Sequence, residues 1–208
     1  MAKISISCWK NGPLVAKGLT NLIDSWGVRL PTEPSMALCR CGESKNKPFC
    51  DGSHKASEFD DAKSPERTAD KRHGYIGQHI TIYNNVLLCS HAEHCVKNLG
   101  SVFDIHRTPW IDPDGDSVEN IRALIDRCPS GALSYSIDGE AAPIPERPPT
   151  IEIEKNGPYR VTGGIELDDA DWCEGASPEH YTLCRCGESK NKPFCDGTHV
   201  HFQFDDEH

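Results

Sequence analysis

The sequence predicts an α+β protein in which two small strand-rich units flank a third small α+β unit. Three observations support this: a gapless internal repeat, two linker-like stretches between its copies, and mixed strand and helix patterns in the segment that they enclose. Of the 208 residues, 37% are hydrophobic, which suits several small cores better than one large core. We place the first repeat unit at 1–62, the middle unit at 73–138 and the second repeat unit at 150–208.

An internal repeat of about 50 residues defines the two outer units. Residues 38–54 read LCRCGESKNKPFCDGSH, and residues 183–199 repeat them with one change, from Ser53 to Thr198. The same offset of 145 residues aligns 10–13 with 155–158, without an insertion. Units this small rarely bury enough surface to be stable alone. We therefore expect the two copies to pack as an internal pseudo-dimer with pseudo-twofold symmetry in a monomeric chain.

Stretches rich in charge or proline, 55–72 and 139–150, read as linkers around the middle unit. Inside that unit we expect a strand at 79–83, an amphipathic helix at 117–127 capped by Asp116 or Ser117, and a strand at 132–137. In the repeats, broken alternation with glycines predicts short strands and bends at 13–22 and 158–167.

The overall charge limits the choice of partner. A formal net charge of -10 repels nucleic acid and anionic membrane surfaces, and an acidic surface suits a basic patch on a partner protein. No apolar run approaches the roughly 18 residues of a membrane span, and residues 1–30 lack a signal-peptide pattern. We therefore expect a cytoplasmic protein that binds no nucleic acid and no membrane. In that reducing compartment, many of the 11 cysteines are expected to be metal ligands.

Each repeat contains four metal-binding side chains with the spacing C-x-C-x8-C-x3-H. They are Cys39, Cys41, Cys50 and His54 in the first copy, and Cys184, Cys186, Cys195 and His199 in the second. Three thiolates and one imidazole within sixteen residues can surround a metal centre without a large core. Asp51 and Asp196 are placed either to cap a helical turn that orients the histidine or to form a plain turn. Spacing alone does not choose the metal, because three cysteines and a histidine also form structural zinc sites.

The repeated motif resembles the signature of the CDGSH iron-sulfur family, also called NEET proteins: C-x-C-x2-(S/T)-x3-P-x-C-D-G-(S/T)-H. Residues 39–54 and 184–199 both match it at every fixed position. The resemblance implies a 2Fe-2S cluster in each copy, with the first two cysteines on one iron and the third cysteine and the histidine on the other. One imidazole in place of a thiolate raises the reduction potential, and its protonation makes the potential and cluster retention depend on pH.

The middle unit offers a third cofactor site at Cys89, Cys95 and Cys128. Its sequence resembles a divergent single-cluster ferredoxin domain in which Ala92 stands in place of one cysteine. Three thiolates can hold a 3Fe-4S cluster, which is our preferred interpretation. A 4Fe-4S cluster is the alternative if His91, His94 or an exogenous ligand supplies the fourth bond, and a degenerate domain with three free thiols is another.

These sites predict a multi-cluster iron-sulfur protein that transfers single electrons to or from a protein redox partner. We expect no enzymatic reaction, since the chain has no G-x-G-x-x-G fingerprint, no P-loop and no nucleophile elbow. An iron-sulfur cluster donor or storage protein that delivers clusters to an apo-protein acceptor is the alternative. A structural zinc-binding interaction module is the alternative from another class.

The cysteines and tryptophans outside these sites are expected to serve packing. Cys8 and Cys173 align with the apolar residues of the other copy and are predicted to be small buried side chains. The four tryptophans, Trp9, Trp26, Trp110 and Trp172, are predicted to lie in the core.

Overall fold

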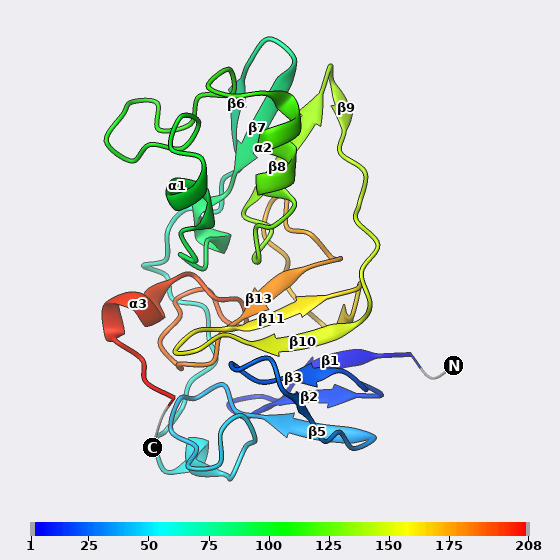
Figure 1. The fold of residues 1–208 in the computed structure, drawn as a ribbon. Coiled ribbons are helices and arrows are strands. Elements are labelled where there is room, and N and C mark those ends of the chain that lie inside the picture. The colour runs from blue at the N-terminus through cyan, green and yellow to red at the C-terminus, as the bar shows by residue number, and fades with distance from the viewer. Residues whose placement is uncertain (1–2, 207–208) are drawn as a thin grey trace.

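The computed structural model describes residues 3–206, and the strands within that range form three sheets (Figure 1). The first repeat unit contains β1 (Ser5–Cys8), β2 (Leu14–Lys17), β3 (Leu22–Ile23), β4 (Arg29–Leu30), β5 (Ser35–Leu38) and the 3-10 helix η1 (Ser53–Lys55). The second contains β10 (Thr150–Ile153), β11 (Tyr159–Thr162), β12 (Glu166–Leu167), β13 (Tyr181–Leu183) and α3 (Thr198–Phe202). The α+β class and its two strand-rich units agree with the prediction.

The two repeat units exchange short strands. β1 pairs in parallel with β12 of the second unit, and β3 of the first unit pairs in parallel with β10. The resulting strand orders are β12-β1-β2-β5 and β13-β11-β10-β3-β4. Because both sheets contain strands from both copies, their apolar side chains merge into one core, which includes Ile6, Leu14, Leu22, Leu38, Ile151, Tyr159, Val161 and Leu183.

The middle unit has its own antiparallel sheet, in the order β6-β7-β8-β9. Its elements are β6 (His73–Ile76), β7 (Ile80–Asn84), the 3-10 helix η2 (Val86–Leu88), α1 (His94–Asn98), α2 (Val118–Ile125), β8 (Leu133–Ile137) and β9 (Glu140–Ala141). The strands expected at 79–83 and 132–137 form, shifted by about one residue. Ser117 caps α2 by accepting the Asn120 N–H at 3.2 Å, and the apolar face of α2 packs into a second core.

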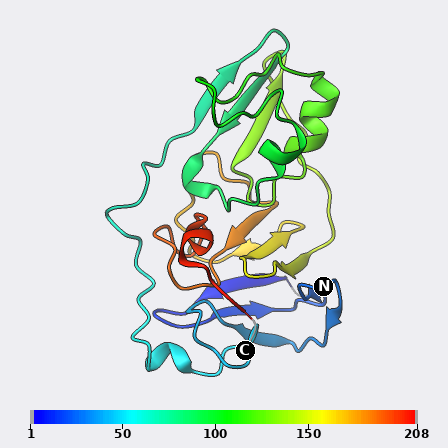
Figure 2. The same cartoon turned by 60° about the vertical axis from the view of Figure 1, so that its left-hand side comes forward.

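The middle unit lies over the second repeat unit, and the first repeat unit lies at the opposite end of the molecule (Figures 1 and 2). The connection from the first repeat unit runs along the second, where the Lys63 Nζ contacts the Asp171 carboxylate at 2.7 Å and the Ser64 N–H donates to the Lys190 carbonyl at 2.9 Å. Within residues 3–206, no helix is both long enough and apolar enough to cross a membrane.

The prediction that all four tryptophans lie in the core is wrong for two of them. Trp9 is 60% exposed and Trp26 is 71% exposed. Both occupy tight turns, since the Gly12 N–H donates to the Trp9 carbonyl and the Trp26 N–H donates to the Asp24 carboxylate. Because these turns lie at the surface, the two tryptophan side chains project into solvent even though they are hydrophobic. Trp110 and Trp172 do pack against the cores, Cys173 is buried, and Cys8 is partly buried.

Candidate metal centres

The segment that follows β5 folds back on itself, so that Pro48 and Cys50 lie beside Cys39 and the end of β5. The Cys39 N–H donates to the Pro48 carbonyl at 2.8 Å, and the Cys50 N–H donates to the Ala37 carbonyl at 2.9 Å. The Ser44 hydroxyl closes the loop by donating to the Phe49 carbonyl at 2.6 Å. Cys50 is thereby placed beside β5, which ends just before Cys39. The second repeat unit forms the same bonds at the equivalent residues.

A glycine turn follows the third cysteine and leads into the short helix that carries the histidine. Gly52 has a φ of 93° and is the residue that precedes η1, so the cap position belongs to glycine and not to Asp51. The Asp51 carboxylate instead links two parts of the loop, accepting the Ser53 N–H at 3.0 Å and the Lys45 N–H at 2.9 Å. The Ser53 hydroxyl and these N–H groups hold the pKa of Asp51 well below its usual range. Asp196 accepts the equivalent two bonds.

The four donors of each motif lie in two pairs. In the first motif, the Cys39 and Cys41 sulfurs are 3.6 Å apart, and the Cys50 Sγ lies 3.4 Å from the His54 Nδ1. The corresponding separations in the second motif are 3.8 and 3.4 Å. Ligands about 2.0–2.3 Å from one tetrahedral metal lie roughly 3.5–3.8 Å apart. Each pair therefore fits one metal ion, whereas no group of three or more His, Cys, Asp or Glu side chains in residues 3–206 is placed to hold a single ion.

The first cysteine of each motif has a lowered pKa, which favours its thiolate form. A hydrogen bond from Cys41, helped by backbone N–H groups that include that of Ser44, lowers the pKa of Cys39 to about 6, although burial opposes the change. The same arrangement lowers the pKa of Cys184 to about 7. The pKa values of Cys41 and Cys186 are raised, because each lies beside its ionising neighbour in a buried place. A bound cation would offset this repulsion.

The C-x-C segments of the two motifs lie side by side. Cys41 and Cys186 form an antiparallel backbone bridge between the repeat units. Gly42 and Gly187 follow them with φ values of 84° and 87°, and a Cβ on either would overlap the carbonyl oxygen of the opposite cysteine. Glycine is therefore required at both positions by the backbone conformation and by the close approach of the other unit.

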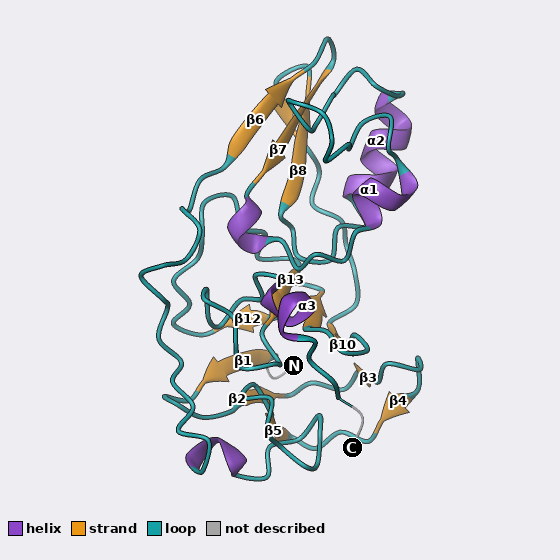
Figure 3. Ribbon diagram, turned by 90° about the vertical axis from the view of Figure 1, so that its left-hand side faces the viewer, coloured by secondary structure: helices purple, strands orange, loops and turns teal. Residues whose placement is uncertain are grey.

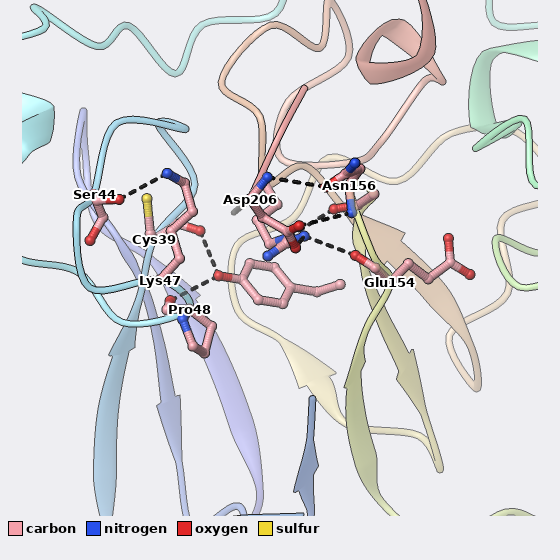
Figure 4. Close-up of polar contacts among 10 residues, drawn as sticks. Cys39, Ser44, Lys47, Pro48, Glu154, Asn156 and Asp206 are labelled. Atoms are coloured by element: carbon pink, nitrogen blue, oxygen red, sulfur yellow. Dashed lines mark hydrogen bonds and ion pairs between the residues drawn. The ribbon is translucent and has the colours of Figure 1, made fainter. Parts of the chain in front are cut away.

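A buried arginine between the first two cysteines fixes each C-x-C segment. Arg40 donates to the carbonyls of Gly12 and Trp9 and to the Asp61 carboxylate, each at 2.7 Å. In the second motif, Arg185 donates to the carbonyls of Gly157 and Glu154 and pairs with Asp206 (Figure 4). Sequence reasoning missed both arginines, although each stands inside the perfect repeat as the middle residue of C-x-C.

Tyr159 links the second repeat unit to the first motif. Its buried hydroxyl donates to the Cys39 carbonyl at 2.7 Å and to the Pro48 carbonyl at 3.0 Å (Figure 4). The equivalent residue of the first repeat unit is Leu14, so this contact has no counterpart on the other motif. The sequence held no signal for it, because a tyrosine aligned with a leucine indicates only a buried position.

Replacing Tyr159 with phenylalanine is expected to lower the free energy of unfolding by about 1–3 kcal/mol. The ring still fills its place, but the buried Cys39 carbonyl loses this donor, while the part-buried Pro48 carbonyl keeps the Cys39 N–H. Urea denaturation of the cluster-loaded protein measures the change. Tyr83→Phe is the control, since among the hydrogen bonds of the described chain the Tyr83 hydroxyl makes one part-buried bond, to the Ser136 hydroxyl at 3.2 Å, and none to a backbone carbonyl. Equal losses in the two variants would contradict the role given to Tyr159.

The three cysteines of the middle unit line one cavity. Cys89 follows η2, Cys95 lies in α1, and Cys128 follows α2; Ala92 and His94 line the same space. Burial raises the pKa of the Cys89 thiol to about 12, so a metal must supply the charge that makes it a thiolate. His91, the other histidine considered as a fourth ligand, lies against Gly197 of the second repeat unit.

Paired sulfur and imidazole donors in two motifs, together with a cavity lined by three cysteines, define an iron-sulfur protein. The family model described as "Iron-binding zinc finger CDGSH type" matches residues 11–55 and 156–200, and the model described as "Divergent 4Fe-4S mono-cluster" matches residues 75–138. The chain therefore belongs to the CDGSH iron-sulfur family, with a divergent single-cluster ferredoxin-like domain between its two CDGSH segments.

Two curated relatives are of unknown function. "Uncharacterized protein YjdI" from Escherichia coli K12 is 44% identical over 61 residues, which make up 29% of this chain and 80% of the relative. The protein of the same name from Escherichia coli O157:H7 matches with the same identity and coverage. These relatives are similar to a part of this chain, and their names assign no activity.

Proposed function

We propose that the protein is a one-electron carrier that holds two 2Fe-2S clusters and one ferredoxin-type cluster and performs no reaction on an organic substrate. The observation that carries this proposal is the pairing of donors in each CDGSH motif. A single zinc ion needs four donors around one point, whereas a 2Fe-2S cluster needs two donors on each of two irons. The separations of 3.4–3.8 Å let each pair hold one metal ion, and no three such side chains in residues 3–206 are placed around a single ion, which fits the second requirement.

We further propose that the two repeat units form a pseudo-twofold pair. The reciprocal strand exchange and the bridge between Cys41 and Cys186 support this arrangement. It brings the two C-x-C pairs to the shared interface. One iron of each cluster would then lie toward the other cluster, which suits movement of an electron between them.

For the middle unit we propose a 3Fe-4S cluster on Cys89, Cys95 and Cys128. Ala92 lines their cavity with a methyl group, where a fourth cysteine would supply a thiolate. His94 lines the same cavity and is the specific candidate for a fourth ligand in the alternative 4Fe-4S cluster. Burial, followed by the charge of Arg127, lowers the pKa of His94 and so favours the neutral form that binds metal.

Analysis of iron, zinc and acid-labile sulfide in protein purified without air tests the proposal directly. We expect a coloured protein with iron and sulfide in amounts that match three clusters, and bleaching of the visible bands by dithionite. A colourless protein that contains zinc and no sulfide would reject the electron-carrier function and favour a structural zinc-binding module.

Replacing Cys95 with serine is expected to remove the middle cluster and leave both CDGSH clusters in place. Electron paramagnetic resonance of the oxidised wild-type protein should show a 3Fe-4S signal that vanishes on reduction and is absent from Cys95→Ser. Cys8→Ser is the matched control, since Cys8 lies in β1 outside all three sites. A middle signal that appears only after reduction, and that His94→Ala alters, would favour a 4Fe-4S cluster.

Cluster donation is a second candidate function, favoured by the exposure of the first motif. Cys50 and His54 are only partly buried, so an acceptor protein has access to these ligands. Incubation of the loaded protein with an apo-ferredoxin separates the two functions. A carrier keeps its iron through repeated reduction and oxidation, whereas a donor loses its visible absorbance as the acceptor gains it.

A further inference from the structure

The two CDGSH motifs have nearly the same sequence but different surroundings. Asn191 is fully buried, with 0% exposure, whereas the equivalent Asn46 is exposed. Cys195 is buried, with 3% exposure, whereas Cys50 is only partly buried. The residues of the motifs cannot cause this difference, because they are the same at every position but one. It arises from what packs against the second motif.

The middle unit supplies one part of the cover over the second motif, and segment 172–173 of the second repeat unit, where Cys173 contacts the Asn191 side chain, supplies another. A Cβ added to Gly197 would lie 2.6 Å from the His91 Cδ2 and 3.1 Å from the Cys89 carbonyl oxygen. The Asn191 side chain donates to the Leu87 carbonyl at 3.3 Å. At the equivalent Gly52, a Cβ would meet no atom within 4 Å. The middle unit therefore covers Gly197 and Asn191 of the second motif and leaves the equivalent Gly52 open, while His54 and His199 are both partly buried.

The covering segment also carries a ligand of the middle cluster site. Cys89 and His91 belong to the loop between η2 and α1, and the His91 ring lies edge-on to the His201 ring of α3, with 6.1 Å between centroids. Figure 3 shows α3 directly beneath this part of the middle unit, with η1 of the first motif at the far end of the molecule. Cys89 and Cys128 also pack against the core that the repeat units share.

We propose that the two motifs have different roles. The second motif is the internal partner of the Cys89, Cys95 and Cys128 site, and the first motif is the external exchange site, where the protein meets the other proteins that give or take its electrons. This division rests on the function proposed above. One electron enters or leaves through the Cys50 and His54 side of the first motif, and no bond to a substrate forms or breaks.

Release of the two clusters can be followed separately in the unmodified protein. The loaded protein is incubated with the ferrous chelator bathophenanthroline disulfonate, and cysteines freed by cluster loss are alkylated with iodoacetamide. Mass spectrometry distinguishes the peptides of the two motifs, because one contains Ser53 and the other Thr198. We expect Cys50 to be alkylated several-fold faster than Cys195. Equal rates for the two cysteines would overturn the proposal.

Two matched glycine variants test whether the middle unit causes the difference. Gly52 and Gly197 both have positive φ, 93° and 83°, so alanine introduces a similar backbone strain at each. Only Gly197→Ala also collides with His91 and Cys89. We expect Gly197→Ala to speed the alkylation of Cys195 more than Gly52→Ala speeds that of Cys50. Cys50 in the Gly197→Ala protein serves as an internal reference for a general loss of stability.

Equal effects of the two glycine variants on their own motifs would overturn the proposal. This result differs from a failure of the proposed function, since chelation and alkylation require no electron transfer. If dithionite failed to reduce any cluster while Cys50 still reacted faster than Cys195, the electron-carrier function would be rejected and the difference in access would stand.

Discussion

Replacing His54 and His199 with cysteine will lower the reduction potential of both CDGSH clusters by on the order of 100 mV. Each substitution exchanges a neutral imidazole for a thiolate and adds one negative charge to the cluster, which disfavours the entry of an electron. Both histidines are placed for this role, with Nδ1 3.4 Å from the sulfur of the neighbouring cysteine. A redox titration monitored by visible absorbance and electron paramagnetic resonance measures the shift.

The control for the histidine substitutions is His201→Gln. His201 lies on α3 in the same helix as His199 but is not one of the paired donors. It should leave the potential nearly unchanged. If the two cysteine substitutions also left the potential and the spectrum unchanged, the histidines would not be ligands, and the assignment of a Cys3His cluster to each motif would be wrong.

Replacing Arg40 with leucine will lower the free energy of unfolding by about 3–5 kcal/mol, because it removes one partner of a buried ion pair. The Arg40 side chain is 2% exposed and that of Asp61 is 11% exposed. Two backbone carbonyls of the β1–β2 turn also lose a donor. Urea denaturation of the cluster-loaded protein measures the change, and Arg185→Leu is expected to have a similar effect in the second repeat unit.

The pH dependence of the Arg40 variant gives a second test. Burial opposes ionisation of Asp61, but hydrogen bonds from Lys10 and Arg40 lower its pKa overall. A lowered folded pKa stabilises the fold above the unfolded value of about 3.9, and this contribution is lost as the pH falls through the folded pKa. The difference in stability between the wild-type protein and Arg40→Leu should therefore be largest near neutral pH and shrink in acid.

Lys10→Ala is the matched control for Arg40→Leu. Lys10 contacts the same Asp61 carboxylate at 2.7 Å, but its side chain is 76% exposed. Solvent screens an exposed ion pair, so Lys10→Ala is expected to destabilise the fold far less than Arg40→Leu. Equal losses for the two variants would show that Arg40 acts only as a surface charge, contrary to its bonds with the β1–β2 turn.

Patterns that are local in the sequence predicted the parts of the fold that depend on local geometry. Ile121, Leu124 and Ile125 share one helical face, and α2 forms there with Ser117 as its cap. The repeat predicted two similar units, and both form. The predicted donors of each motif lie in two close pairs, and their role as cluster ligands stays a prediction. The helix and its cap were predictable because a 3.6-residue period and a capping side chain act over a few residues.

The contacts between units were beyond sequence reasoning. β3 and β12 each contain two residues, which is too short for a pattern to indicate which sheet they join. The different environments of Cys50 and Cys195 are invisible in two motifs that differ at one position, since the residues that cover the second motif lie outside it, in the middle unit and in segment 172–173. Trp9 and Trp26 show the related limit, because their hydrophobicity favours the core while the turns that contain them direct them to solvent.

The exchange of β3 and β12 makes each repeat unit incomplete without the other. A sheet that lacks its borrowed strand leaves the backbone groups of β1 or β10 without partners and exposes part of the shared core. The middle unit, besides its own cofactor site, is therefore the covalent tether that keeps complementary halves at high effective concentration. Either repeat unit produced as a separate chain would have to recruit a second copy of itself to supply the missing strand.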